Sequence, residues 1–283
     1  MMRALHTSTQ FPTRAYLARV GLPALPPPTA DGLSELVLAQ VRSIAFENLD
    51  VLAGVPVRLD RAIVYEKILG AGRGGYCFEL NALMSGALEA AGFDVRPVMA
   101  RVTYGRTVPG PATHQALVVK CDGQEWLVDV GFGGPGPERP LPIVASKVHT
   151  VEGTQFRLVP SFGGDLHLQR KVGNEWNGLF LLSLAQTRST DIQAANHFIS
   201  SWKRSPLRHR LMCTLPVPGG LLTVQGTDLV RLDRQLSEVE RRPLNDALGF
   251  YDTLRGPLRI KADPALVQRA WETAVAAIKF VTP

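Results

Sequence analysis

Apolar residues recur every three to four positions over roughly the first ninety residues, which predicts a helical region. The clearest run of such positions consists of Leu33, Leu36, Val37, Val41 and Ile44. Thr29 or Asp31 could cap this helix, because both side chains accept hydrogen bonds from free backbone N–H groups.

Two further helices are predicted before residue 95. Asp60 could cap the first of them, and the glycines of "GAGRGG" would end it. Its inward-facing positions are expected to be Ile63, Val64 and Ile68. The second starts near Cys77, carries a broad apolar face and ends at Gly92.

From Val95 the pattern changes to short segments rich in β-branched and aromatic residues, separated by turn residues. The predicted strands lie in "VRPVMARVTYG", "HQALVVKC", "EWLVDVGFG", "FRLVP", "LHLQRKV" and "WNGLFLLSL". Beyond about residue 210, "GGLLTVQGTDLVRL" predicts two more strands. The last helix is expected in "DPALVQRAWETAVAAIKF", with Asp263 as its cap and Pro264 in its first turn.

The composition is that of a soluble globular protein, with 45% hydrophobic and 20% charged residues among 283. The first residues contain no continuous apolar segment, so we expect no secretory signal. The longest uncharged stretch, Leu211 to Thr227, is interrupted by proline and glycine and is not expected to span a membrane. Three cysteines, an odd number, favour a reducing cytoplasm over a disulfide-bonded protein.

A net charge of +6 comes mainly from 24 arginines spread along the chain. The one dense cluster, "KRSPLRHR" at 203–210, could bind nucleic acid or an anionic, nucleotide-bearing cofactor, or could be a solvated surface. No aromatic-interleaved basic stripe or nucleic-acid motif supports the first alternative.

Cys77 stands in the segment "AGRGGYCFELN", at the expected start of a helix. Free N–H groups and the positive end of the helix dipole would stabilise a thiolate there, and Arg73 could add positive charge. Gly74 and Gly75 would allow another backbone or a substrate to approach. Cys77 is therefore a candidate nucleophile; the alternative is a small buried hydrophobic side chain.

A nucleophilic cysteine needs a base, and of six histidines His114 has the most suggestive setting. The others are His6, His149, His167, His197 and His209. Asp122-Gly123 predicts a two-residue hairpin turn in which Lys120 lies opposite Glu125. The same register makes His114 and Asp129 diagonal neighbours on one face. A three-residue turn would put them on opposite faces, and an incidental polar pair is the other alternative.

Cys77, His114 and Asp129 thus form a candidate nucleophile, base and orienting acid for acyl transfer. This set alone does not say whether the acyl acceptor is water, an amine or a thiol.

Several segments resemble the arylamine N-acetyltransferase family. They are "YLARVGL", "FENLDV", "RGGYCFELN", "THQALVV", "LVDVGFGG" and "ANHFISSWKRSPL", spread over about residues 11–260. The resemblance implies an α+β fold with a core related to papain-like cysteine proteases and transglutaminases. It implies a helical domain over 1–94 with the cysteine, a β-barrel-like domain over 95–207 with the histidine and aspartate, and an α/β lid over 208–283.

The resemblance also implies the reaction. Acetyl-CoA would give its acetyl group to Cys77, and the thioester would then acetylate an arylamine or arylhydrazine in ping-pong order. His114 would act as base and Asp129 would orient it, without a metal. The expected partners are the small acceptor and CoA, with no nucleic acid or membrane, and the protein would be a cytoplasmic monomer or homodimer.

Other positions are carried over from the family. Phe46, Val102 and Phe132 would line an apolar pocket for the flat acceptor, with core packing as the alternative. The cofactor would contact Thr113, Gly131 and Gly133. Glu47 and Arg73 would form an ion pair beneath the site.

Two positions depart from the family pattern: Gln115 replaces an aliphatic residue and Leu207 replaces phenylalanine.

Three alternatives to the arylamine activity stay open. They are an amide synthase of the same family in secondary metabolism, a thiol hydrolase or transglutaminase-like enzyme, and a binding module.

Overall fold

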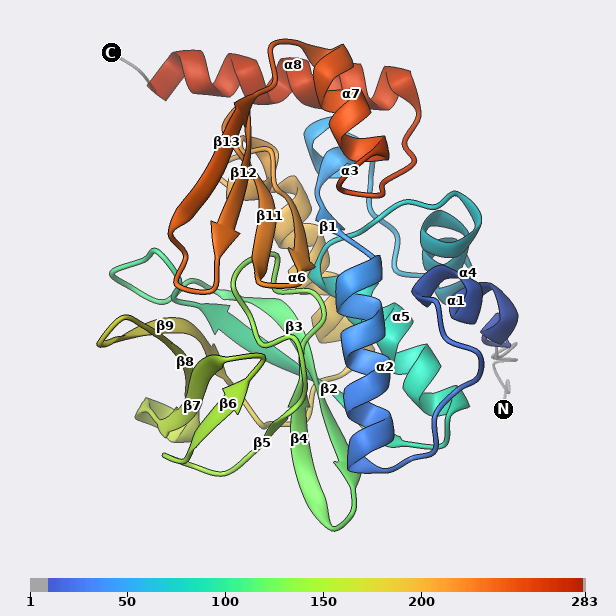
Figure 1. Cartoon of the computed structure of the whole chain (residues 1–283), viewed down its shortest axis with the longest axis vertical. Helices are drawn as coiled ribbons and strands as arrows, with labels where there is room; N and C mark the ends of the chain where they lie inside the picture. The colour runs from blue at the N-terminus through green and yellow to red at the C-terminus, as the bar shows by residue number, and fades with distance from the viewer. Residues whose placement is uncertain (1–9, 282–283) are drawn as a thin grey trace.

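The computed structural model describes residues 10–281. The three parts of the fold are helices α1 to α5, an eight-stranded sheet, and a five-stranded sheet with two further helices (Figure 1). His6 and the start of the segment considered for a secretory signal lie outside the described residues.

The three helices predicted in this region are present, and α1 and α3 are additions that were not predicted. Its elements are α1 (Thr13–Val20), α2 (Ala30–Ser43), α3 (Leu49–Leu52), α4 (Arg61–Tyr65), η1 (Glu66–Gly70) and α5 (Cys77–Ala90). Thr29 caps α2 by accepting a hydrogen bond from the Gly32 N–H at 3.2 Å. Of the three positions expected to face inward, Val64 on α4 and Ile68 on the π-turn η1 are buried, whereas Ile63 is 36% exposed.

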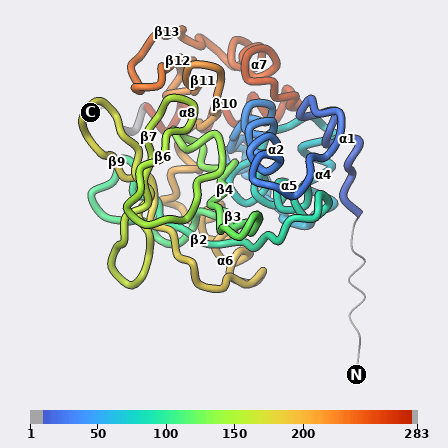
Figure 2. The backbone as a smooth tube through the Cα atoms, turned by 60° about the horizontal axis from the view of Figure 1, so that its bottom comes forward, coloured from blue at the N-terminus to red at the C-terminus, as the bar shows by residue number. Residues whose placement is uncertain are grey.

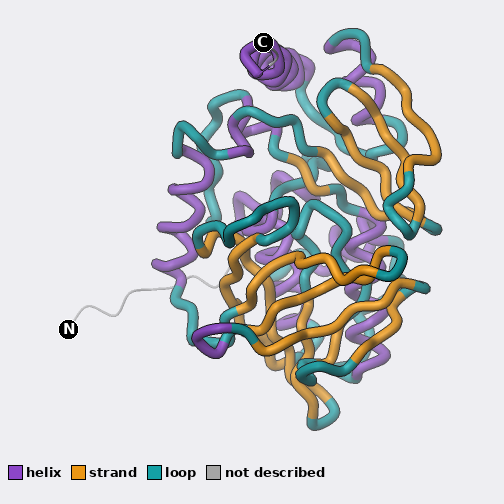
Figure 3. The backbone as a smooth tube through the Cα atoms, turned by 90° about the vertical axis from the view of Figure 1, so that its left-hand side faces the viewer, coloured by secondary structure: helices purple, strands orange, loops and turns teal. Residues whose placement is uncertain are grey.

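The middle of the chain forms a nearly closed, barrel-like antiparallel sheet in the order β5-β4-β3-β2-β9-β8-β7-β6 (Figure 3). Its strands are β2 (Asp94–Val102), β3 (Ala112–Cys121), β4 (Gln124–Val128), β5 (Leu141–Pro142), β6 (Val148–Val151), β7 (Thr154–Pro160), β8 (Leu166–Val172) and β9 (Glu175–Leu182). A short 3-10 turn, η2 (Phe162–Gly164), joins β7 to β8. One face of the sheet encloses Phe156, Leu168 and Phe180, while the other packs Leu117 and Val119 against the helical core.

The β3–β4 hairpin has the predicted register. Cys121 pairs with Gln124, Lys120 pairs with Glu125, and the two turn residues between them have positive φ angles of 50° and 72°. The Lys120 Nζ lies 3.9 Å from a Glu125 carboxylate oxygen. With this register, the side chains of His114 and Asp129 lie on the same face of the sheet.

The last part of the chain contains more strands than expected. It comprises α6 (Ser189–Ser201), η3 (Pro206–Arg208), β10 (Cys213–Val217), β11 (Gly220–Gln225), β12 (Asp228–Asp233), β13 (Glu238–Pro243), α7 (Ala247–Arg255) and α8 (Pro264–Val281). Only β11 and β12 were predicted; β13 is exposed along its whole length and therefore lacks an apolar alternation. Asp263 caps α8 as expected, since its Oδ1 accepts the N–H groups of Ala265 and Leu266.

A two-residue strand links the helical part to the last sheet. Strand β1 (Phe46–Glu47) pairs with β10, and Phe46 also forms a parallel bridge with Gly75. Gly75 lies two residues before Cys77, so the start of α5 is held beside the five-stranded sheet. Helices α1, α2, α4 and α5 cluster on one side of the molecule, next to β3 and β4 (Figure 2).

Candidate active site

Cys77 is the first residue of α5, as the sequence predicts. Tyr76 is the N-cap residue, and its N–H donates to a Glu79 carboxylate oxygen at 3.1 Å. Cys77 is buried and its thiol faces the Thr113 carbonyl at 3.8 Å. The thiol therefore lies beside the free N–H groups of a helix end, where negative charge is favoured.

A buried ion network supports this helix start. Arg73 donates to Glu47 at 2.8 Å and to Asp50 at 3.0 Å, which confirms the expected Glu47–Arg73 pair. Lys67 extends the network to Asp50 and Glu79, with both distances 2.6 Å. Burial alone would lower the pKa of Arg73, but the two carboxylates raise it. Arg73 is thus held by acids below the site and is not directed at the thiol.

His114 and Asp129 form a short, buried pair. The His114 Nε2 lies 2.6 Å from the Asp129 Oδ2, and both residues are almost fully buried. Burial alone would lower the pKa of His114. The Asp129 carboxylate and a hydrogen bond to the Cys77 side chain raise it instead, to about 10. The imidazole therefore carries a proton at neutral pH and faces both the carboxylate and the thiol.

Asn81 joins all three segments of the site and was not singled out from the sequence. Its amide nitrogen donates to the carbonyls of Cys77 and Gln115 and to the Asp129 Oδ1, at 3.1, 2.7 and 3.3 Å. Its amide oxygen accepts the Val130 N–H at 3.3 Å. The available signal was a polar residue inside the apolar face of α5, one turn after Cys77.

The two predicted cofactor glycines lie against the protein itself. A side chain at Gly131 would bring its Cβ within 2.7 Å of the Cys77 Cα, and the Gly131 N–H donates to Asp129 at 2.9 Å. Gly133 has a φ of +70°, and a Cβ there would lie 2.7 Å from the Phe46 ring. Both positions require glycine for the loop after β4 to reach the site.

Aromatic rings surround the imidazole on the barrel side. The Phe132 ring centroid is 5.5 Å from that of His114, and Phe180 lies 5.1 Å from His114. Tyr104 contacts Phe132 at 6.2 Å. Val102 is half-buried and pairs with Phe180 across the β2–β9 ladder. Phe180 and Tyr104 are additions to the predicted set.

Thr113 and Leu207, the remaining positions noted from the sequence, lie in different surroundings. Thr113 contributes its carbonyl to the thiol, whereas its hydroxyl donates to the Pro111 carbonyl at 3.4 Å. Leu207 belongs to the same buried apolar cluster as Cys77 and Phe46. Its carbonyl accepts from the Asn48 side chain at 2.7 Å, which holds this segment beside β1.

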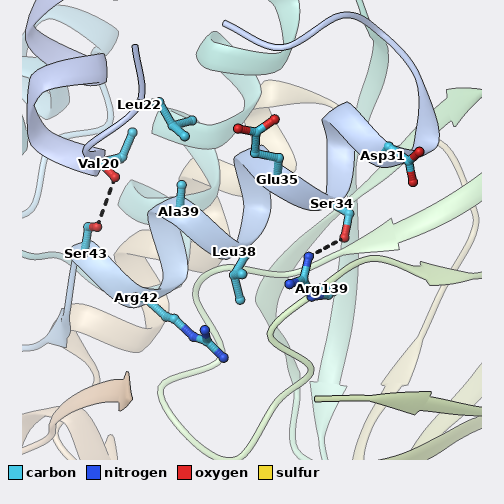
Figure 4. A pocket seen from close by; sticks show the side chains of 10 residues that line it. All are labelled: Val20, Leu22, Asp31, Ser34, Glu35, Leu38, Ala39, Arg42, Ser43 and Arg139. Carbon is cyan, nitrogen blue, oxygen red and sulfur yellow. Dashed lines mark hydrogen bonds between the residues drawn. The ribbon is translucent and has the colours of Figure 1, made fainter. Parts of the chain in front are cut away.

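A surface pocket of about 440 Å³ on the outer face of α2 is separate from this site (Figure 4). Arg42 and Arg139 line it, but both are engaged by carboxylates, Arg42 with Glu138 and both with Glu152, each at 2.7 Å. None of the predicted site residues lines this pocket.

The sequence matches the family model described as N-acetyltransferase over residues 29–267. It is 34% identical over 244 residues to the arylamine N-acetyltransferase / N-hydroxyarylamine O-acetyltransferase of Salmonella typhimurium, which covers 85% of this chain and 86% of that protein. The chain belongs to the arylamine N-acetyltransferase family. It is an acyltransferase, and the activity its family name describes is acetyl transfer.

The fold agrees with that of solved family members. The structure of Mycobacterium marinum arylamine N-acetyltransferase in complex with CoA superposes with a TM-score of 0.85 and 32% identity, covering 92% of this chain and 99% of that one. Proansamycin X synthase of Amycolatopsis mediterranei is 31% identical over 187 residues, which cover 64% of this chain and 71% of that protein.

Two further properties of the described residues concern membrane spans and metal sites. No helix within residues 10–281 has the length and apolar character needed to cross a membrane. Over the same range, no group of three or more His, Cys, Asp or Glu side chains is arranged to hold a metal ion.

Replacing Asn81 by alanine is expected to slow alkylation of Cys77 by iodoacetamide roughly tenfold or more, because helix α5 loses its hydrogen bonds to Gln115 and Asp129. The free energy of unfolding should fall by about 2 kcal/mol, since buried groups lose their partners. Peptide-mapped alkylation rates and urea unfolding measure the two effects. Asn177→Ala, on the exposed part of β9, is the control; an unchanged alkylation rate in Asn81→Ala would refute the positioning role.

The pH dependence of alkylation should shift in Asp129→Asn. Burial opposes the charged ring, and without the carboxylate the His114 pKa loses its largest upward cause, so a smaller share of the imidazole is protonated at neutral pH. Less imidazolium is then available to stabilise the Cys77 thiolate, and alkylation of the variant should be slower than that of the wild type at neutral pH. In the wild type, the raised His114 pKa stabilises the fold fully below about pH 6.5, an effect lost as the pH rises through about 10. Identical alkylation profiles for the two proteins would contradict this role of Asp129.

Proposed function

We propose that the protein transfers an acetyl group from acetyl-CoA through a Cys77 thioester to the nitrogen of an arylamine or arylhydrazine. The observation that carries the proposal is the buried contact series from the Cys77 thiol through His114 to Asp129 at the start of α5. Family membership and the CoA complex of the Mycobacterium marinum relative support the choice of donor.

In the first half-reaction, the Cys77 thiolate attacks the acetyl carbonyl carbon of the donor. A carbon–sulfur bond to Cys77 forms as the bond to the CoA sulfur breaks, and His114 can give its proton to the departing thiolate. Asp129 keeps the ring oriented and stabilises its positive charge before this transfer.

In the second half-reaction, the amine nitrogen attacks the thioester carbon. The neutral His114 takes a proton from the nitrogen, the Cys77 thiolate leaves, and the charged pair with His114 is restored. Phe132, beside the imidazole, offers an apolar ring surface next to the position from which the nitrogen must attack. Phe46 and Val102 would complete the acceptor pocket.

Two parts of the proposal go beyond the triad. The carbonyl side of Thr113 and the loop containing Gly131 and Gly133 would flank the pantetheine arm, because they border the thiol. The three cysteines are free and buried, which supports a reducing, cytoplasmic environment.

The proposal is tested by intact-protein mass spectrometry after brief exposure to acetyl-CoA without an acceptor, followed by peptide mapping. We expect one acetyl group on Cys77, which disappears when an arylamine is added and does not form in Cys77→Ala. Cys121 and Cys213, both buried, are internal controls in the same maps.

An unmodified protein whose Cys77 still reacts with iodoacetamide would contradict the choice of acetyl-CoA as donor. If Cys77 is acetylated but no arylamine or arylhydrazine removes the group, the proposed acceptor class is wrong. An amide synthase resembling proansamycin X synthase would then be the alternative to test.

A further inference from the structure

Arg170 is a buried cation that the proposed reaction does not use. On β8 it follows Leu168 by two positions, so both side chains lie on the barrel's inner side, where the alternating pattern calls for an apolar residue. Arg170 is only 6% exposed, and its guanidinium lies over the Phe156 ring at 5.6 Å. A charge at such a position is costly, and a specific role is therefore expected.

Its hydrogen-bond partners are two backbone carbonyls from different parts of the chain. Nη1 donates to the Pro135 carbonyl at 2.9 Å and Nη2 donates to the Arg234 carbonyl at 2.6 Å, while Nε has no partner. None of the described carboxylates lies within ion-pair distance of Arg170; burial lowers its pKa, and the charges of Glu138 and Asp233 oppose this from farther away. The side chain thus connects two loops rather than neutralising an acid.

The first loop carries the aromatic contact of the site. Pro135 lies three residues after Phe132, whose ring contacts His114 at 5.5 Å. The far end of the loop is held separately, since Glu138 pairs with Arg42 on α2 at 2.7 Å. Arg170 therefore supplies the fixed point at the end nearest Phe132.

The second loop belongs to the five-stranded sheet. Arg234 lies in the connection from β12 to β13, and the neighbouring Gln235 accepts the Gly173 N–H at 2.9 Å. These contacts join the end of the β12–β13 hairpin to the barrel (Figure 1). The Arg170 guanidinium thus bonds to both segments, and a longer Arg234–Glu138 ion pair of 4.0 Å joins the hairpin to the far end of the same loop.

We propose that Arg170 is a positioning residue that holds the loop 132–138, which carries Phe132 and Gly133, against the β12–β13 hairpin so that the loop can flank the acyl donor. This inference rests on the proposed function and deepens it. Asn81 holds Cys77 and Asp129, Asp129 holds His114, and none of these contacts involves Arg170. Loss of Arg170 should therefore impair acetylation by a large donor while a small alkylating reagent still reacts normally.

The test compares wild type, Arg170→Met, Arg170→Lys and the control Arg157→Met. Arg157 is the matched barrel arginine on β7, whose guanidinium lies over Trp176 at 4.2 Å and donates to Gln169, away from both loops. We expect single-turnover acetylation of Arg170→Met by acetyl-CoA to slow roughly tenfold or more, with an unchanged rate of Cys77 alkylation by iodoacetamide. Arg170→Lys, which can still donate to a carbonyl, should recover part of the loss.

Hydrogen exchange of the peptide covering 131–139 gives a readout that does not need acetyl-CoA. It should be faster in Arg170→Met and unchanged in Arg157→Met. Wild-type acetylation or wild-type exchange in Arg170→Met would overturn the positioning role, as would a parallel loss of iodoacetamide reactivity. If acetyl-CoA does not acetylate Cys77 of the wild-type protein, the proposed function is wrong. The hydrogen-exchange result would still decide whether Arg170 holds the loop.

Discussion

The side chain of Asn81 connects the helical part of the molecule to the sheet that carries the base. Its amide is hydrogen bonded to backbone or side-chain groups of Cys77, Gln115, Asp129 and Val130, so the first turn of α5 can take one position against β3 and the end of β4. Gly131 makes the same approach possible sterically, since a Cβ at this position would lie 2.7 Å from the Cys77 Cα. The geometry of the nucleophile and its base depends on this contact.

The charged side chains near the Asn81 contact form two separate buried groups. Below the helix start, Arg73 and Lys67 form ion pairs with Glu47, Asp50 and Glu79, which fixes the loop before Cys77. Beside the thiol lies the His114 imidazolium, which Asp129 stabilises. The arginine four residues upstream of the cysteine therefore supports the backbone, and the histidine supplies the charge that acts on sulfur.

Local signals explain why much of the site was predictable. The Asp122-Gly123 turn and the Lys120–Glu125 pair define the hairpin register, and a two-residue period then places His114 and Asp129 on one side. The glycines before Cys77 likewise mark the helix start. Asn81 and Arg170 were not predicted because their partners lie far away in the chain, and only the folded structure brings them together. Strand β1 is two residues long and pairs with β10, about 170 residues later, so no periodicity could reveal it.

The central claim is that the protein holds a protonated His114 between Asp129 and Cys77 before any substrate arrives. The most direct measurement is the nitrogen-15 chemical shift of the His114 ring as a function of pH in the free protein. Both ring nitrogens should keep imidazolium shifts from pH 6 through 8 and begin to titrate only as the pH approaches about 10. A His114 that loses its proton near its ordinary pKa of about 6.5 would contradict this charge arrangement, and with it the proposed activation of Cys77.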